Sequence, residues 1–154
     1  MEADIQEKFQ ELLGLVRLAD NLGYNSLTKT SHYSTAPYQA FQQFPILARL
    51  SAEAPNVRLN AGIILLSLHK PLDLAEQLAS LDVMCGGKLI VGAALGYREV
   101  EFKAFGTTSR ERAPRFEENL VALKRLWTED FVDMVGSHFE LDGAACLPKP
   151  LQQP

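Results

Sequence analysis

The chain has 154 residues, of which 47% are hydrophobic and 22% are charged, and its formal net charge is −4. This composition is typical of a globular protein with a core of its own, and it excludes a disordered chain. The acidic balance, without a Lys/Arg cluster, argues against nucleic acid and a membrane surface as partners. No apolar run is long enough to cross a bilayer, and no signal peptide is recognisable. Cys85 and Cys146 form no metal or disulfide motif, which indicates a cytoplasmic protein.

The N-terminal residues predict a helix, a short strand and a loop. Apolar residues recur at helical spacing over residues 4–22, and Gly23 follows them as a stop signal. Residues 24–30 are rich in the types that favour strands. Residues 31–37 are typical of a loop.

A second helix and a buried strand follow. We expect Pro37 to begin a helix that extends to about Ala54, with Pro45 as a break or restart. Residues 57–66 are β-rich and become wholly apolar in their second half. That pattern is expected of a strand buried on both faces.

The next segment predicts a helix, a tight turn and another buried strand. Pro71 suits the first position of a helix that runs to Met84. Gly86 and Gly87 follow this helix and precede a strand over residues 88–95. In a dinucleotide-binding loop the glycines follow a strand and open a helix, so these two indicate a helix C-cap instead.

The C-terminal third predicts a long helix, a hairpin and an irregular tail. We expect the helix over residues 111–128, and a hairpin over residues 131–141 that turns at Gly136-Ser137. Residues 147–154 form a Pro-rich extended tail. The apolar residues on the inner side of the helix are expected to be Phe116, Leu120, Leu123, Leu126 and Trp127.

The order of these elements defines the fold class. Helices alternate with strands, which indicates an α/β fold with right-handed crossovers and a parallel sheet. The pattern is compatible with a doubly wound sheet and with part of a (β/α)8 barrel. In either fold, ligands bind where the strands end.

Several successive motifs carry a family resemblance that covers the chain from about residue 9 to residue 154. The strand and helix segments are "ADNLGYNSLTKTSHY" and "NVRLNAGIILLSLHKPLDLAEQLASLD". They are followed by "KLIVGAALGYREVEFKAFG", "ERAPRFEENLVALKRLWT", "GSHFEL" and "PKPLQQP". In this order they resemble the luciferase-like monooxygenases, a family that includes flavin- and deazaflavin-dependent oxidoreductases.

The resemblance implies a (β/α)8 TIM barrel that holds a reduced flavin (FMN) or a deazaflavin at the C-terminal ends of its strands. Members of the family are about twice as long as this chain or more. The sequence opens on the first helix and stops where the family continues into a fifth strand. Three parallel strands cannot close a barrel. We therefore expect a single incomplete barrel domain over residues 1–154, either a fragment, a truncated gene product or one of two chains.

His32 is the candidate catalytic residue. It follows the strand at residues 24–30 and matches the second histidine of the family's "EHH" pattern. Histidine is the acid/base suited to neutral pH, and this is the ligand-binding end of a barrel. Thr30 and Ser31 replace the preceding acidic residue and first histidine, which weakens the expectation of a proton relay through those positions.

The resemblance implies cofactor contacts on the next strand, at Gly62, Ile63 and Ile64. The family has a non-prolyl cis peptide bond and a bulge near this point, on which the flavin ring packs. The alternative is ordinary strand core. Gly92, inside the neighbouring strand, indicates close approach of a backbone or a ligand.

Further cofactor contacts are implied at Ala94, Gly96, Tyr97 and Arg98, where the third strand ends. Tyr97 and Arg98 could reach the ribityl chain or the phosphate, although Arg98 also suits a surface loop. The luciferase branch of the family carries a phosphate-binding arginine at the position of Leu95, so its absence weakens the expected hold on FMN.

The remaining chemistry-bearing residues define no second kind of site. His69 and His138 suit structural or loop positions, and the histidines lack the spacing of a metal site. No nucleophile motif indicates hydrolysis. The function expected is that of a flavin-dependent monooxygenase acting on a small organic substrate, with a deazaflavin-dependent oxidoreductase as one alternative. The other alternative is a non-catalytic half-barrel remnant that folds by self-association, and a homo-oligomer is expected.

Overall fold

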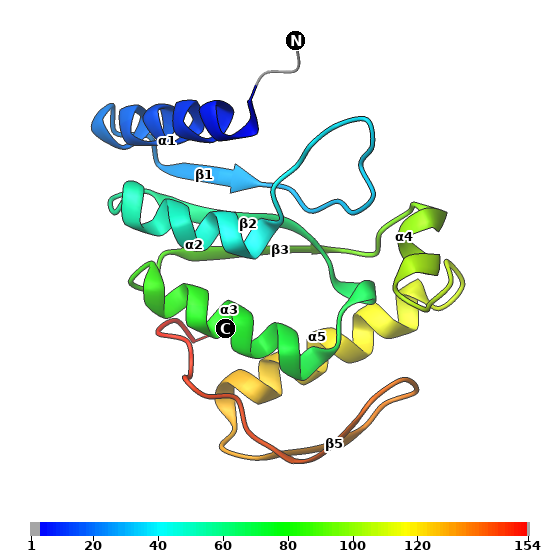
Figure 1. Ribbon diagram of the computed structural model, residues 1–154. Coiled ribbons are helices and arrows are strands. Elements are labelled where there is room, and N and C mark those ends of the chain that lie inside the picture. The colour runs from blue at the N-terminus through cyan, green and yellow to red at the C-terminus, as the bar shows by residue number, and fades with distance from the viewer. Residues whose placement is uncertain (1–3, 154) are drawn as a thin grey trace.

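The computed structural model describes residues 4–153, in which three parallel strands form a sheet and a separate hairpin follows. Helices α1, α2 and α3 lie along the sheet, and α5 runs below α3 beside the hairpin (Figure 1). The elements, in chain order, are α1 (Ile5–Asn21), β1 (Ser26–Lys29), α2 (Gln43–Glu53), β2 (Arg58–Leu65), η1 (Leu66–Leu68), α3 (Pro71–Met84), β3 (Leu89–Ala94), α4 (Glu99–Ala104), α5 (Arg112–Thr128), β4 (Val132–Val135) and β5 (Glu140–Ala144).

The sheet has the order β1-β2-β3, and both pairings are parallel. Parallel pairing follows from the helical crossover between each strand and the next. The expectation of an α/β fold with three parallel strands, flanking helices and a hairpin is therefore confirmed. All three strands end on the side of the molecule where α4 lies (Figure 1).

One apolar core joins the helices to one face of the sheet. Leu59 and Ala61 of β2 point into it and are fully buried, together with Leu47 of α2 and Leu74 of α3. Leu126 brings α5 into the same core. The opposite face of the sheet carries Asn60 and the glycines of β2 and β3, and it is more open to solvent.

The second helix is shorter than predicted. It begins at Gln43, not at Pro37, and residues 37–42 form a loop. Pro45 lies in its first turn, where a residue without an N–H loses no hydrogen bond. The predicted restart at Pro45 therefore falls in the first turn of the helix, two residues after its start.

Three predictions of burial are wrong. Leu120 is exposed on α5, and the adjacent Asn119 occupies the inner face instead. The strand predicted over residues 88–95 is an edge strand rather than a buried one, because β3 pairs with β2 alone and Val91 is 40% exposed. Ile63 of β2 is also exposed, since it points to the open face of the sheet.

Other predictions are confirmed. Gly86 and Gly87 both have positive φ angles and end α3, as a C-cap requires. The hairpin turns at Gly136 and Ser137. Residues 147–153 lie outside helices and strands and Pro154 lies outside the described residues, so the extended tail stays a prediction. No helix within residues 4–153 has the length and apolarity needed to span a membrane.

Candidate functional site

A hollow of about 570 Å³ lies where the three strands end. Its volume is in the range of small-molecule sites in proteins. Most of its wall is apolar, and the polar groups come from the residues after β1 and β3. The lining residues are Thr30, Ser31, His32, Gly62, Ile63, Leu65, Ala93, Ala94, Leu95, Gly96, Tyr97 and Phe116.

Six of the eight predicted site residues line this hollow. His32, Gly62, Ile63, Ala94, Gly96 and Tyr97 come together there from three strand ends. Ile64 does not, because its side chain is 1% exposed and lies in the core on the helix side of the sheet. Arg98 does not line it either.

The floor of the hollow is formed by Gly62 and Ile63 of β2, where the strand is irregular. The Gly62-Ile63 peptide bond is cis, and the pairing of β2 with β3 shifts between Gly62 and Ile64. The non-prolyl cis bond and the bulge implied by the family resemblance are therefore present. The extra residue turns Ile63 toward the open face, where it forms part of the hollow.

The glycines of this floor allow close packing. A Cβ atom added at Gly62 would lie 2.6 Å from Asn60 Oδ1, and one added at Gly92 would lie 3.4 Å from the Gly62 Cα atom. The Asn60 amide donates to Thr28 Oγ1 at 3.2 Å, which holds it over Gly62. The close backbone approach expected at Gly92 is confirmed.

A buried carboxylate holds the wall that carries His32. Glu101 of α4 is 1% exposed, and its Oε1 atom lies 3.1 Å from His32 Nδ1. The same oxygen accepts the backbone N–H of Tyr33 at 2.9 Å and a hydrogen bond from Arg98 at 3.2 Å. Since one ring nitrogen of His32 faces Glu101, the carboxylate fixes the orientation of the imidazole in the hollow.

Arg98 joins the loop after β1 to the start of α4. Its guanidinium donates to the carbonyl oxygens of Tyr33 at 2.7 Å and Ser34 at 3.0 Å, in addition to Glu101. These contacts lie beside the hollow and not in it. The structure therefore places Arg98 as a support for the loop that presents His32.

The backbone at the rim is held from behind by polar side chains. Ser67 donates to the carbonyl of Leu95 at 2.7 Å, and Arg112 donates to the carbonyl of Gly96 at 3.4 Å. Asn119, fully buried on α5, donates to the carbonyls of Leu66 and His69 at 2.9 Å each. These hydrogen bonds fix the loops after β2 and β3, so the backbone of the rim has a defined conformation.

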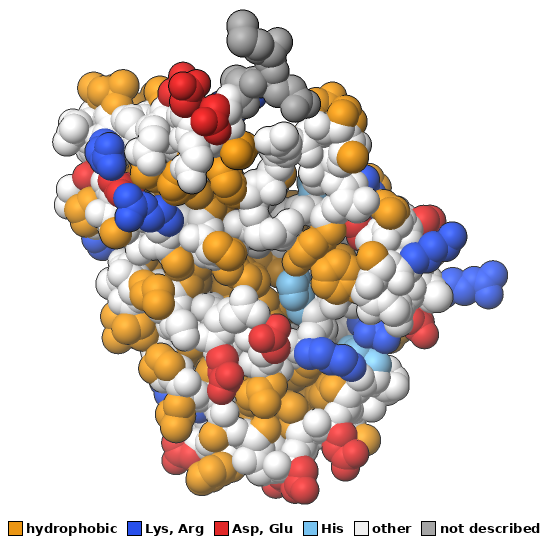
Figure 2. All heavy atoms as spheres, in the orientation of Figure 1, with side chains coloured by type: hydrophobic (Ala, Val, Ile, Leu, Met, Phe, Trp, Pro, Cys, Tyr) orange, Lys and Arg blue, Asp and Glu red, His pale blue; other side chains and the backbone are white. Residues whose placement is uncertain are grey.

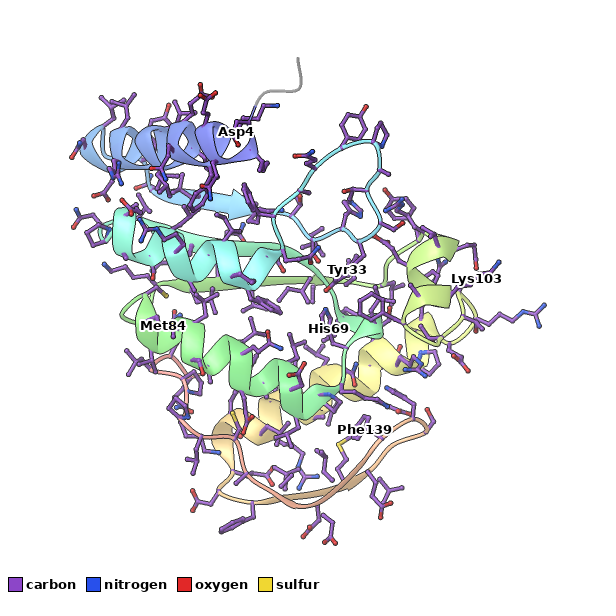
Figure 3. The ribbon with its side chains drawn as sticks, in the orientation of Figure 1. Asp4, Tyr33, His69, Met84, Lys103 and Phe139 are labelled. Atoms are coloured by element: carbon purple, nitrogen blue, oxygen red, sulfur yellow. The ribbon has the colours of Figure 1, made fainter. Side chains whose placement is uncertain are left out.

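His69 lies outside the hollow, on the other side of the loop after β1. Its ring is within 6.5 Å of the ring centroids of Tyr33, Phe44 and Phe105, and Figure 3 shows Tyr33 and His69 side by side near α4. Burial lowers the pKa of His69, which favours the neutral imidazole. Burial also raises the pKa of Tyr33.

Sequence reasoning missed Glu101 and Asn119. Glu101 stands three residues after Arg98 in a charge-rich segment, and that spacing on a helix was the only local signal for it. Asn119 lies beside apolar residues on the inner face of α5. A polar residue at such a position indicates that a buried group needs a hydrogen-bond partner.

The hollow suits an organic ring more than an anion or a metal. Its wall is mainly apolar, and its described lining contains neither lysine nor arginine. Within residues 4–153, no group of His, Cys, Asp and Glu side chains has the arrangement of a metal site. The residues present thus fit a flat ring system, but they offer no cation to a phosphate group.

The three-stranded sheet, its helices and the hollow at the strand ends are arranged like one side of a parallel barrel. The profile of the luciferase-like monooxygenases matches residues 1–154, and the chain belongs to this family.

Two relatives are informative. The chain is 32% identical over 146 residues to an FMNH2-dependent dimethylsulfone monooxygenase from Pseudomonas putida, covering 91% of this chain and 40% of the relative. It is 26% identical over 151 residues to the oxygenase component of a flavin-dependent trigonelline monooxygenase from Acinetobacter baylyi, covering 97% and 42%. The chain thus spans less than half the length of these relatives.

Solved structures agree with the fold. A monooxygenase from Streptomyces bottropensis superposes with a TM-score of 0.85 and 33% identity, over 94% of this chain and 44% of that one. The FMN complex of the oxygenating component of 3,6-diketocamphane monooxygenase from Pseudomonas putida superposes with a TM-score of 0.81 at 16% identity, over 90% and 39%. The second likeness concerns the fold alone.

Proposed function

We propose that the hollow at the ends of β1, β2 and β3 holds the ring system of a reduced flavin, and that the chain forms the N-terminal part of a flavin-dependent monooxygenase. The observation that carries this proposal is the bulge at Gly62-Ile63, which forms an apolar floor under the polar rim residues His32 and Tyr97. A relative whose name states FMNH2 dependence supports the choice of flavin.

Each residue that lines the hollow would have its own role toward the flavin. Ile63, Leu65 and Ala94 would pack against the ring, and the backbone at Gly96 would lie at its edge. His32, oriented by Glu101, would exchange a proton with the cofactor or the substrate. When bound, the flavin supplies the redox chemistry between oxygen and a small organic substrate, and the protein supplies binding, orientation and exclusion of water.

The phosphate of FMN needs groups beyond this wall. Leu95 lines the hollow where the resemblance implies an arginine in the luciferase branch, and the guanidinium of Arg98 is occupied by the loop after β1. We therefore propose that residues 1–154 act as one incomplete barrel domain. In this arrangement the cation that binds the phosphate comes from another segment of polypeptide.

A deazaflavin is the alternative cofactor. An F420-dependent secondary alcohol dehydrogenase has the same fold, with a TM-score of 0.81 at 21% identity. The hollow of this chain would accommodate either tricyclic ring, since the two differ little in shape. Comparing the binding of both cofactors decides between them.

We also propose that the protein is a cytoplasmic homo-oligomer. The two cysteines are free and buried, which fits a reducing compartment. A groove of about 370 Å³ between α2 and α3 contains the side chains of Phe44, Ala48 and Met84 beside two carboxylates. Figure 2 shows apolar side chains gathered on this face of the molecule. Self-association, through the exposed strands, is also what the non-catalytic alternative requires, and light scattering measures it.

A titration of the chain with FMN, followed by flavin fluorescence, tests the proposal. We expect saturable binding with a Kd on the order of micromolar, about −8 kcal/mol, or weaker for the ring alone. Ala94→Trp, which fills the hollow, is expected to abolish it. Ala52→Trp, at an exposed position on α2, is the matched control and should bind as well as the natural chain. A folded chain that binds no FMN at millimolar concentration would assign the non-catalytic function.

A further inference from the structure

A second cavity lies outside the hollow, on the other side of the loop that carries His32. Its volume is about 280 Å³, just below the range of sites for drug-sized molecules, so it has room for a small organic ion. Its walls come from the loops after β1 and β2, the first turn of α2, the start of α3 and the end of α4. Ser31 lines both this cavity and the hollow, so the two lie back to back.

Aromatic rings surround His69 at this cavity. The ring centroids of Tyr33, Phe44 and Phe105 lie 6.5, 6.2 and 6.4 Å from the ring centroid of His69. Tyr33 and Phe105 also contact each other edge to face, with their centroids 4.5 Å apart. All four rings line the cavity, and Figure 3 shows Tyr33 and His69 next to one another near α4. Aromatic rings grouped in this way attract a cation, because their faces carry negative potential.

Asp73, in the first turn of α3, adds a negative charge to the cavity. Its Oδ2 atom accepts a hydrogen bond from Gln77 at 2.9 Å. Burial is the main reason that the pKa of Tyr33 is raised and that the pKa of His69 is lowered, and the charge of Asp73 acts on both groups in addition. The carboxylate therefore lies near both rings, where it would also attract a cationic ligand.

The residues that line the cavity supply no positive charge to balance Asp73. Neither lysine nor arginine is present in the lining within residues 4–153. Because burial lowers the pKa of His69, its imidazole is neutral near pH 7. The cavity thus combines aromatic rings with a carboxylate and leaves the place of a cation open.

Two buried polar atoms at the cavity lack a hydrogen-bond partner among the described residues. Gln43 is 4% exposed, and its Nε2 atom donates to the carbonyl of Lys29 at 2.5 Å, whereas its Oε1 atom has no donor. The Nε2 atom of His69 is also without a partner. Buried polar groups are ordinarily paired, so an N–H group brought to Gln43 Oε1 would form a hydrogen bond that the free protein lacks.

We propose that this cavity is a second small-molecule site, separate from the hollow at the strand ends, and that it binds a small organic ammonium ion. The charge would lie among the rings of Tyr33, Phe44 and Phe105 and beside the carboxylate of Asp73. An N–H group of the ion would donate to Gln43 Oε1. The site is independent of the proposed flavin chemistry, because no residue that would pack against the flavin ring lines this cavity.

A neutral molecule of the same shape is the alternative occupant. It would fill the same volume, but it would gain nothing from the charge of Asp73 and little from the faces of the aromatic rings. An anion is disfavoured, because it would lie beside a carboxylate with no cation to balance the two charges. The ratio of the affinities for a cation and for a neutral molecule of its size therefore identifies the occupant.

The experiment titrates the folded chain, without flavin, with n-butylammonium chloride and with n-butanol, which has the same size and no charge. Ionic strength is kept constant with sodium chloride, because salt screens the attraction of the carboxylate. Amide chemical shifts in NMR spectra locate the ligand. We expect saturable changes near Tyr33, Phe44 and Asp73, with a Kd on the order of millimolar for the cation and about tenfold weaker binding of n-butanol. Ala94 and Tyr97, which line the hollow, should change little.

Two pairs of variants separate the contributions of charge and ring. Asp73→Asn keeps the shape of the side chain and should weaken binding of the cation by about tenfold. Glu76→Gln is the matched control, because it removes the same charge from α3 outside the cavity, and it should leave the affinity unchanged. Phe105→Leu should weaken binding severalfold, whereas Phe131→Leu, at an exposed position before β4, should not.

Three outcomes would overturn the inference. These are equal affinities for n-butylammonium and n-butanol, equal losses in Asp73→Asn and Glu76→Gln, and shift changes that avoid the cavity. Urea denaturation of each variant shows that it is folded, so that a loss of binding is assigned to the site. Because flavin is absent, failure of ammonium binding leaves the proposed flavin site unaffected, and failure of flavin binding leaves this cavity unaffected.

Discussion

Glu101 Oε1 lies 3.1 Å from His32 Nδ1, across a gap of 69 residues in the sequence. The carboxylate is buried on α4, and the histidine follows β1 at the rim of the hollow. Glu101 also accepts the N–H of Tyr33 and pairs with Arg98. One side chain thus fixes both the imidazole and the loop that carries it. A buried acid with three partners is costly to change, because each partner loses its acceptor.

Glu101→Ala tests this role. We expect the free energy of unfolding to fall by about 1–3 kcal/mol, because Arg98 and the N–H of Tyr33 lose a buried acceptor. We expect FMN binding to weaken as well, since His32 is no longer oriented. Urea denaturation and fluorescence titration measure the two effects. Glu99→Ala, on the exposed side of the same helix, is the control and should change neither. Equal effects of the two substitutions would remove Glu101 from the site.

Gly62→Ala tests the packing of the floor. The added Cβ would meet Asn60 Oδ1 at 2.6 Å, so the amide must move and give up its hydrogen bond to Thr28. We expect a loss of about 1–3 kcal/mol in the free energy of unfolding. In the Asn60→Ala background the same substitution should cost much less, and the double-mutant cycle measures the difference.

Gly14→Ala is the control for Gly62→Ala. Gly14 lies in α1, with nothing within 4 Å of an added Cβ. Alanine there should stabilise the protein by about 0.5–1 kcal/mol, because glycine is a poor helix former. A Gly62→Ala chain as stable as the natural one would contradict the packing described for the floor.

Leu95→Arg is predicted to strengthen the binding of FMN. Leu95 lines the hollow, and its carbonyl is held by Ser67, so a longer side chain at this position starts from a fixed backbone. A guanidinium that reaches the phosphate should gain about tenfold in affinity, or 1.4 kcal/mol. Riboflavin, which lacks the phosphate, should bind the variant no better than the natural chain. An equal gain for both ligands would mean that the arginine acts on the ring.

The stability of the protein is predicted to fall in mild acid. Burial lowers the pKa of His69, and the opposing effect of Asp73 is smaller. In the unfolded chain the histidine has a pKa of about 6.5. As the pH falls, His69 therefore binds a proton in the unfolded chain before it does so in the folded chain. The free energy of unfolding should decrease as the pH falls below about 6.5.

His69→Gln should flatten this dependence. His138, whose pKa is also lowered chiefly by burial, contributes in the same direction, so His138→Gln should flatten it further. Urea denaturation at a series of pH values between neutrality and pH 5 measures the slope. A slope that is the same in the natural chain and in both variants would mean that neither histidine is kept neutral by folding.

The elements that sequence predicted well are those with a strong local signal. The helical spacing of apolar residues located α1, Pro71 located the start of α3, and glycines 86 and 87 located the turn before β3. The order of helices and strands was sufficient for a parallel sheet. Helix α4 was missed because its six residues alternate between charged and apolar side chains, which is not the apolar period of a helix.

The parts that sequence could not predict depend on distant neighbours. An apolar strand such as β3 has the same composition whether its second edge is covered or free, so the exposure of Val91 has no local signal. Asn119, and not Leu120, lies on the inner face of α5 because its amide donates hydrogen bonds to the carbonyls of Leu66 and His69. These carbonyls belong to a distant part of the sequence, so α5 itself carries no signal for them. The family resemblance and the position after a strand were sufficient to place His32 at the strand ends, where it lines the hollow. Its catalytic role stays a prediction, and its contact with Glu101 could be seen only in the folded chain.

A residue-resolved map of FMN on the folded chain, by amide chemical-shift changes in NMR spectra, tests most directly whether the strand ends form the flavin site. We expect the largest changes at the three strand ends, in residues 30–32, 62–65 and 93–97. Residues of the groove between α2 and α3 should change little. Changes confined to that groove, or none at saturating FMN, would contradict the claim that the strand ends form the flavin site.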